Sequence, residues 1–291
     1  MTAAQVAGVP VVDHVGAAAA IRTVCGDAWV SCDRLSEGPV KALIECARCQ
    51  VPRGKRACDS RDGAAPRGCP TRHADEALAA AERVYQDPQV RHFAVTASCQ
   101  EAAGYSDRTT GARPALTRIE EVCEFAARAG FRRLSVAFCA GLVDEARRLD
   151  EVLVARGFDV VSAVCKVGAV AKEALGLADE DKVRPGTFET LCNPILQAEL
   201  LNRAGAELNI LLDLCVGHDA LFLGHAVAPC TVLAVKDRVL GHNPLAALFT
   251  SGSYYRRLLA GDGNSAAGLE VPGRGATKPV EPVTGGRRRR G

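Results

Sequence analysis

The fold is decided by three stretches of sequence: LSVAFCAG (134–141), FDVVSAVCKVG (158–168) and LNILLDLCVG (208–217). Each is a short apolar run that ends on a cysteine, and a glycine follows within three residues to permit a sharp turn. Runs that are apolar throughout, without polar alternation, are typical of strands buried on both faces of a sheet. A fourth run of this kind, TVLAV, occupies residues 231–235.

Helical patterns separate these runs. Leu142, Ala146 and Leu149 recur at helical spacing after the first run, and Asn193-Pro194 and Asn243-Pro244 each place a capping residue before a proline, as at a helix start. Strands alternating with helices predict an α/β fold: a three-layer sandwich with a mostly parallel, flavodoxin-like or Rossmann-like sheet of four or more strands. Because crossovers are right-handed, we expect the first strand to lie between the second and the third.

Composition divides the chain into four segments. Residues 1–43 are rich in Ala and Val without clear periodicity, which predicts a weakly ordered extension. Residues 44–72 are dense in Cys, Gly, Pro and Arg, as in a loop held by a ligand. The α/β domain is expected over residues 73–259, and residues 260–291, which end in four arginines, are expected to be disordered. The helical patterns at the start of this domain include one after His73, one after Pro88 and one opened by the capping-box pair Thr117 and Glu120.

Charge and hydropathy exclude several classes of partner. The 291 residues include 36 basic and 34 acidic side chains, for a net charge of +2, so no nucleic-acid or membrane-surface partner is expected. No apolar run reaches bilayer-spanning length, and the N-terminus has no pattern of a secretory signal. These features predict a cytoplasmic protein. Its 13 cysteines then indicate metal ligands or redox-active thiols, because a disulfide framework is typical of short secreted chains.

The first cysteine group lies in residues 44–72 and reads Cys46-x2-Cys49-x8-Cys58-x10-Cys69-Pro70. The CxxC pair puts two sulfurs on one tight turn, and the two later thiols complete a tetrahedral set. The spacing leaves zinc and an iron–sulfur cluster open, because zinc usually shows two CxxC pairs whereas a terminal Cys-Pro is typical of ferredoxin-like runs. We call residues 44–72 the knuckle.

The second group lies where the strands end. In an open α/β sheet the ligand crevice lies beyond the carboxyl ends of the strands, so thiols at three such ends point into one region. Basic side chains beside a cysteine favour its thiolate. The residues that we expect to bind a cofactor there are Cys139, Cys165, Cys192, Cys215, His218, Lys166, Lys236 and His242.

Three other cysteines match the ordinary role of cysteine as a small buried residue. Cys123 lies on the apolar stripe of an expected helix, and Cys230 lies at the start of a strand, away from the crevice. Cys99 is likewise expected to lie in helix packing.

The segments FCAGLVDEA (138–146), VCKVGAV (164–170), LCNPILQAELLN (191–202), LCVGHDALF (214–222) and APCTVLAVKDRVLGHNPLAAL (228–248) together resemble one family. It is the cysteine-rich, metal-binding family catalogued as domain of unknown function 1847, and the resemblance runs from about Cys46 to Leu258. Metal binding is what this resemblance implies, without a reaction. It supports both cysteine groups, His218 and His242 as site residues, although the Arg-rich loop between Cys49 and Cys69 is unusually long for the family.

Three functional hypotheses remain open. The first is a metalloprotein in which the knuckle holds zinc or an iron–sulfur cluster and the strand ends hold a second centre for electron transfer or for a small sulfur-containing ligand. The second is a metal-free thiol enzyme with Cys165 or Cys215 as nucleophile and His218 as base. The third is a non-catalytic module in which the knuckle and the arginine tail bind RNA or a partner protein. Nucleotide-dependent enzymes, hydrolases and zinc proteases are disfavoured, since no Walker A, GxSxG or HExxH motif is present.

Overall fold

The computed structural model describes residues 44–260, and the chain divides into two compact units, Met1–Gly130 and Phe131–Gly291. The N-terminal extension expected at residues 1–43, and the tail beyond residue 260, lie outside the described residues. The knuckle and the helices that follow it fall in the first unit. The strands that end on cysteine all fall in the second.

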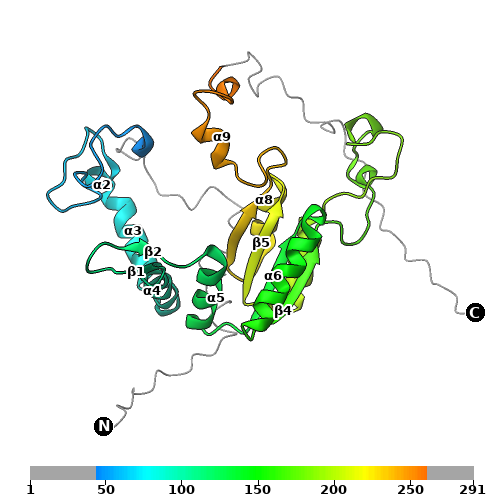
Figure 1. Ribbon diagram of the computed structural model, residues 1–291, viewed down its shortest axis with the longest axis horizontal. Helices are drawn as coiled ribbons and strands as arrows, with labels where there is room; N and C mark the ends of the chain where they lie inside the picture. The colour runs from blue at the N-terminus through cyan, green and yellow to red at the C-terminus, as the bar shows by residue number, and fades with distance from the viewer. Residues whose placement is uncertain (1–43, 261–291) are drawn as a thin grey trace, which may run out of the picture. The chain divides into compact units, whose positions relative to one another are not determined.

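The second unit is built on a four-stranded parallel sheet (Figure 1). Its strands lie in the order β4-β3-β5-β6, so the first strand from the sequence lies between the second and third, and that prediction is confirmed. All four apolar runs that predicted strands form them. The strands are β3 (Arg133–Phe138), β4 (Asp159–Val164), β5 (Leu208–Leu214) and β6 (Cys230–Val235).

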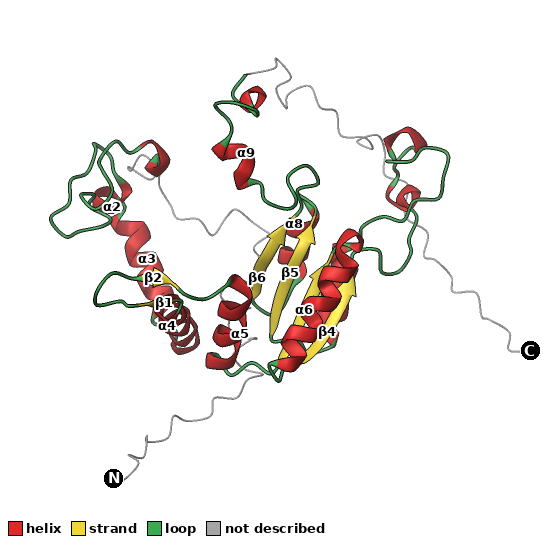
Figure 2. Cartoon of the chain, viewed as in Figure 1, coloured by secondary structure: helices red, strands yellow, loops and turns green. Residues whose placement is uncertain are grey.

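Helices cover both faces of this sheet, which confirms the three-layer α/β fold (Figure 2). Helix α6 lies in front of the strands in this view, and the sequence stripe that predicted it is buried along one side. Helix α7 begins at the expected Asn-Pro pair, where the Asn193 side chain accepts a hydrogen bond of 3.1 Å from the Leu196 N–H. The helices of this unit are α6 (Val143–Ala155), α7 (Pro194–Arg203), α8 (His218–His225) and α9 (Leu245–Phe249), with short 3₁₀ turns η3 (Ala140–Leu142) and η6 (Arg256–Leu258).

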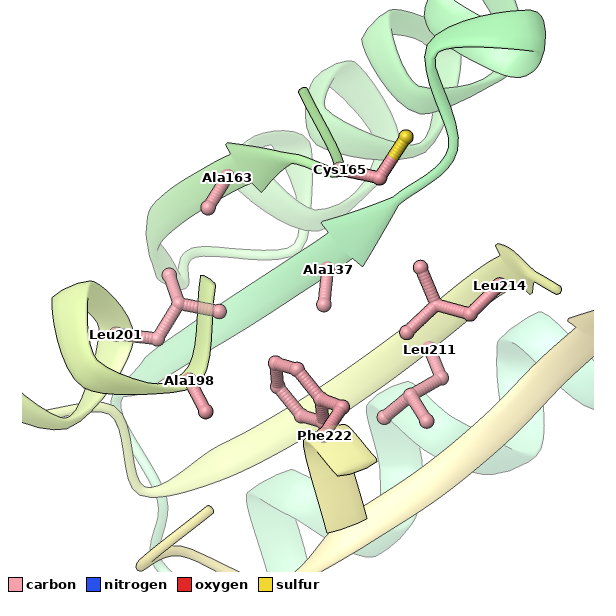
Figure 3. Packing of buried hydrophobic residues seen from close by; sticks show 8 residues of the cluster. All are labelled: Ala137, Ala163, Cys165, Ala198, Leu201, Leu211, Leu214 and Phe222. Atoms are coloured by element: carbon pink, nitrogen blue, oxygen red, sulfur yellow. The ribbon is translucent and has the colours of Figure 1, made fainter. Parts of the chain in front are cut away.

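The interior between the sheet and helices α7 and α8 is made mostly of Ala and Leu (Figure 3). Ala137 and Leu211 come from adjacent strands, and Ala198 of α7 and Phe222 of α8 pack against them. Cys165 lies at the edge of this cluster, where β4 gives way to the following loop. A close-packed interior therefore fixes the strand ends from below, because such interiors resist rearrangement.

The long connection from β4 to α7, residues 166–192, carries order that the sequence did not predict. It contains η4 (Lys172–Leu175) and η5 (Asp179–Asp181), and its two ends pair through an Ala171–Thr190 bridge. The Lys182 side chain is only 3% exposed, and its ammonium group lies 2.6 Å from both Glu173 and Asp179. The connection is therefore a folded appendage to the carboxyl edge of the sheet.

The first unit consists of the knuckle followed by a small helical assembly. The expected capping box is present, with Thr117 and Glu120 each bonded to the other's backbone N–H. Helices α4 and α5 pack through an edge-to-face contact of Phe93 and Phe125, whose ring centroids are 5.2 Å apart. A short antiparallel pair, β1 with β2, was not predicted. The elements are η2 (Cys46–Arg48), α2 (Pro70–His73), α3 (Asp75–Tyr85), α4 (Pro88–Ala103), β1 (Tyr105–Ser106), β2 (Arg113–Pro114) and α5 (Arg118–Arg128).

No helix within residues 44–260 combines the length and the apolar character that a membrane span requires.

Candidate thiolate site

Three strand-end cysteines meet at the carboxyl edge of the sheet because β4, β3 and β5 are adjacent and parallel. Cys139 continues the ladder from β3 by donating its N–H to the Leu212 carbonyl, and Cys165 donates its N–H to the Phe138 carbonyl. Cys192 joins them because the next residue, Asn193, donates its N–H to the Cys165 carbonyl at 2.8 Å. The sulfurs of Cys165 and Cys192 lie 3.9 Å apart.

A buried glutamine, which the sequence gave no reason to select, holds two of these strand ends together. Gln197 of α7 is fully buried, and its side-chain amide donates to the carbonyls of Phe138 (3.2 Å) and Ala163 (2.7 Å). Phe138 directly precedes Cys139, and Ala163 lies two residues before Cys165. The amide thereby joins the ends of β3 and β4 to α7 through two buried hydrogen bonds.

One glycine is needed for the backbone to turn at this edge, and a second lies beside the thiols, where an added Cβ would make only ordinary contacts. Gly168 has a φ of +87°, and a Cβ built on it would lie 2.8 Å from the Leu196 side chain. Gly141 lies against the site itself, where a Cβ would come within 3.5 Å of the Lys236 ammonium nitrogen and 3.8 Å of the Cys139 sulfur. A side chain at position 141 would therefore lie beside both the ammonium and the Cys139 thiol.

Hydrogen-bond donors are directed at three of the four sulfurs. The Ala140 N–H donates to the Cys165 sulfur at 3.3 Å, and the Gly141 N–H donates to the Cys139 sulfur at 3.4 Å. The Arg238 guanidinium donates to the Cys215 sulfur at 3.3 Å. Donors of this kind stabilise sulfur in its anionic form.

The surroundings create two thiolates, on Cys139 and Cys192. The Cys165 thiol, the Gly141 N–H and the Lys236 ammonium lower the pKa of Cys139 to about 5, against an opposing effect of burial. The Cys165 thiol and the His218 imidazole, with Lys166 nearby, lower the pKa of Cys192 to about 4. Both groups are therefore anionic at neutral pH.

The other two cysteines of the site are shifted the opposite way. Cys165 stands between the two thiolates as their shared hydrogen-bond partner, and both contacts, together with burial, raise its pKa. Burial raises the pKa of Cys215, although Arg238 opposes this effect.

The basic residues selected from the sequence take different partners. The Lys236 ammonium bonds the buried carboxylate of Asp213, and His242 Nδ1 lies 2.5 Å from the other oxygen of that carboxylate. Lys166 donates to the Thr190 carbonyl in the long connection. His218 Nδ1 is buried without a hydrogen-bond partner among residues 44–260. Asp213 was missed by the sequence reasoning, although a carboxylate inside the apolar run LNILLDLC was a signal that could have found it.

The remaining cysteines among residues 44–260 divide as follows. Cys123 is buried on α5, and Cys230 lies at the start of β6, at the amino end of the sheet, where burial raises its pKa to about 11. Both agree with the role of packed core residues. The expectation for Cys99 was wrong: it is exposed on α4, because the buried stripe of this helix runs through Thr96 and Gln100 instead.

The knuckle brings its four cysteines around one cavity of about 570 Å³, which Cys46, Cys49, Cys58 and Cys69 all line, with Arg48, Arg56 and Arg67. The Cys46–Arg48 turn is closed by the Cys49 N–H, which donates to the Cys46 carbonyl at 3.2 Å. Arg56 and Ala64 pair as an isolated bridge, and a Cβ on Gly63 would lie 2.1 Å from the Arg56 carbonyl oxygen, so glycine is required there. Cys46 and Cys58 are exposed.

The donor chemistry at both places suits a thiophilic metal. Two thiolates of one tetrahedral zinc site lie about 3.8 Å apart, because each Zn–S bond is about 2.3 Å. The Cys165–Cys192 separation of 3.9 Å matches that spacing. Within residues 44–260, however, no three Cys, His, Asp or Glu side chains are already arranged around one ion. The Cys165 and Cys192 sulfurs are therefore spaced as two ligands of one metal ion would be. Cys139 and Cys215 are assigned to the same set because they follow adjacent parallel strands and carry the same donor atom.

Comparison with known proteins places these features in a family without an assigned reaction. A family model described as "Protein of unknown function (DUF1847)" matches residues 69–233. The uncharacterized protein MJ0455 of Methanocaldococcus jannaschii is 43% identical over 145 residues, which cover 50% of this chain and 72% of that protein. No solved structure is significantly similar to the chain. The matched region includes all four strand-end thiols and the last knuckle cysteine.

Proposed function

The chain belongs to the family of proteins of unknown function DUF1847, and we propose that it is a metal-binding protein whose strand-end thiolates hold an iron–sulfur cluster. The observation that carries this proposal is the meeting of Cys139, Cys165, Cys192 and Cys215 at one edge of the sheet. Thiolates are the ligands that zinc and iron–sulfur centres share.

The arrangement of the sulfurs favours a cluster over a single zinc ion. Cys215 bonds Arg238, and among residues 44–260 it makes no hydrogen bond to another thiol. A single ion needs all four sulfurs at mutual distances of about 3.8 Å, whereas a multinuclear cluster accepts ligands that lie further apart. The N–H groups of Ala140 and Gly141 already point at the sulfurs, and such bonds tune the potential of a cluster.

Charge balance supports the same assignment. Thiolate ligands carry negative charge that must be offset when they are partly buried. Lys236 lies beside Cys139, Lys166 and His218 act on Cys192, and Arg238 bonds Cys215. When bound, a cluster at this edge would supply one-electron redox chemistry or a site for a small sulfur-containing ligand. The protein residues orient the sulfurs, stabilise their charge and leave the edge accessible through the glycine turns.

The knuckle is proposed as a second, separate metal site. Its four cysteines line one cavity, and its Gly, Pro and Arg content leaves too little apolar surface to hold the loop by packing alone. Four thiolates and a nearby set of arginines suit zinc or a cluster equally. We propose that metal binding here is structural, because Cys46 and Cys58 are exposed and no residue of the knuckle is buried.

The test is metal analysis of protein purified without oxygen, with matched cysteine variants. Wild-type protein should be brown and contain iron and acid-labile sulfide. Cys139→Ser, Cys165→Ser, Cys192→Ser and Cys215→Ser should each lose iron and sulfide equivalent to one cluster per chain, whereas Cys230→Ser, on the same sheet at its opposite end, should retain the wild-type amounts. Wild-type amounts of iron and sulfide in all four of the first variants would contradict the proposal.

One observation favours the metal-free thiol enzyme as a second candidate. Cys192 has His218 and Lys166 beside it and the lower of the two depressed pKa values, about 4. The nucleophile of such an enzyme would then be Cys192, because the pKa values of Cys165 and Cys215, the residues expected from the sequence, are raised. Colourless protein without iron, in which Cys192 alone reacts rapidly with an alkylating agent, would favour this candidate.

A further inference from the structure

Asp213 occupies an unusual place in the sheet. It is fully buried on β5, yet its φ is +66°, in the left-handed region that residues other than glycine seldom adopt. The pairing of β5 with β6 is irregular on both sides of Leu212, so Asp213 lies at a bulge. Bulges re-aim a side chain, and strain of this kind persists only where the surrounding structure enforces it.

The Asp213 carboxylate has two basic side chains against it. One oxygen bonds the Lys236 ammonium, whose side chain is 8% exposed, and the other lies 2.5 Å from His242 Nδ1. His242 also has a positive φ, of 65°, and its turn is closed by its own N–H, which donates to the Asp237 carbonyl at 2.9 Å. The neighbouring turn therefore holds the imidazole against Asp213 and fixes the carboxylate from one side.

The Lys236 ammonium also lies close to Cys139, since a Cβ built on Gly141 would be 3.5 Å from the Lys236 nitrogen and 3.8 Å from the Cys139 sulfur. The ammonium thus has both the Asp213 carboxylate and this sulfur near it. A lysine ammonium is strongly hydrated and sits on a flexible stem, so burial opposes holding it in place. The Asp213 carboxylate is the partner that offsets this cost. Without it, the ammonium would gain more from hydration than from a single sulfur contact.

From this geometry we infer that Asp213 is a positioning residue that holds Lys236 against the Cys139 sulfur. The inference deepens the proposed function, because it concerns the same strand-end thiols. Nothing in it requires a bound metal, however. It assigns to a residue outside the thiol set the task of keeping one cation fixed at the edge of the sheet.

The experiment measures lysine acetylation in the metal-free, full-length protein by mass spectrometry. Asp213→Asn and Asp213→Gly both remove the charge. Asparagine and glycine both tolerate a positive φ, so the backbone is preserved. Acetylation of Lys236 should rise about tenfold or more in each variant. Lys182, which is 3% exposed and has its own carboxylate partners Glu173 and Asp179, is the internal control and should change by less than twofold.

A second measurement separates positioning from simple charge. The alkylation rate of Cys139 in mildly acidic solution should fall in Asp213→Asn and also in Lys236→Met, with Cys192 unaffected in both. If the two charges acted independently, the Asp213 variant would instead raise the rate.

Unchanged protection of Lys236, a faster Cys139 in Asp213→Asn, or equal exposure of Lys182 would each overturn the inference. If acetylation of Lys236 rises as expected in the Asp213 variants but the native protein contains no metal, the role of Asp213 is supported and the proposed metal centre is contradicted.

Discussion

The two cysteine groups differ in what holds their sulfurs. The strand-end thiols are fixed by a parallel sheet, by the Gln197 amide and by the interior beneath Cys165. The knuckle thiols are carried by turns, with one isolated bridge and two exposed cysteines. The same kind of thiol group can therefore be held by a fold or can require a ligand to hold it. We propose that the strand-end thiols are of the first kind and the knuckle thiols of the second.

The largest expected effect is a difference in thiol reactivity within one sheet. In chelated, folded protein at neutral pH, Cys192 and Cys139 are thiolates, with pKa values of about 4 and about 5, whereas Cys230, with a pKa of about 11, is almost entirely protonated. Alkylation, followed by mass spectrometry, should therefore label the first two at least about a hundredfold faster. The rates of Cys139 and Cys192 should fall only as the pH drops toward 5 and 4. Equal protection of Cys139, Cys192 and Cys230 from alkylation would show that the strand-end thiols behave as ordinary core residues.

Chelation should affect the knuckle much more than the strand-end site. Removing metal is expected to raise tryptic cleavage within residues 44–72 about tenfold, because the apo loop lacks a packed interior to hold it. Residues 131–259 should remain resistant, since their interior does not involve the knuckle cysteines. Cys46→Ser and Cys49→Ser should reproduce this pattern without a chelator. An unchanged cleavage rate after metal removal would show that the knuckle is not ligand-held.

Two glycine variants compare the knuckle with the strand-end site directly. Gly63→Ala places a Cβ against the Arg56 carbonyl of the knuckle, a backbone clash that should abolish the Arg56–Ala64 bridge and the knuckle's metal. Gly168→Ala, at a φ of +87° and beside Leu196, should cost the second unit about 1–3 kcal/mol yet leave it folded. Zinc and iron content and thermal unfolding measure the two effects. Metal retention in Gly63→Ala would contradict the ligand-held account of the knuckle.

The smallest effect is expected at Cys99. Its side chain is exposed on α4 and belongs to neither group, so Cys99→Ser should change the free energy of unfolding by less than about 0.5 kcal/mol and should leave metal content unaltered. Loss of metal in this variant would mean that a third thiol set exists.

Much of the strand-end site could be predicted because its signals are local. Apolar runs that end on Cys139, Cys165 and Cys215 indicate strands, and the right-handed crossover rule gives their order. Asp213 stands out in the apolar run LNILLDLC, but the direction of its side chain could not be predicted, since the bulge that re-aims it arises from the pairing of β5 with β6. Gln197 was missed for a similar reason, because its two carbonyl partners come from distant strands. The exposure of Cys99 depends on which stripe of α4 meets α5, a tertiary choice that an Ala-rich helix does not specify.

The most direct test of the central claim is the iron and acid-labile sulfide content of the Cys46→Ser/Cys49→Ser double variant, purified without oxygen. This variant disables the knuckle and leaves the sheet and its four thiols intact. We predict that iron and sulfide remain in amounts that correspond to one cluster per chain, and that adding Cys192→Ser removes them. A double variant with no iron and no sulfide, while wild-type protein contains both, would contradict the claim that the strand ends form a metal centre of their own.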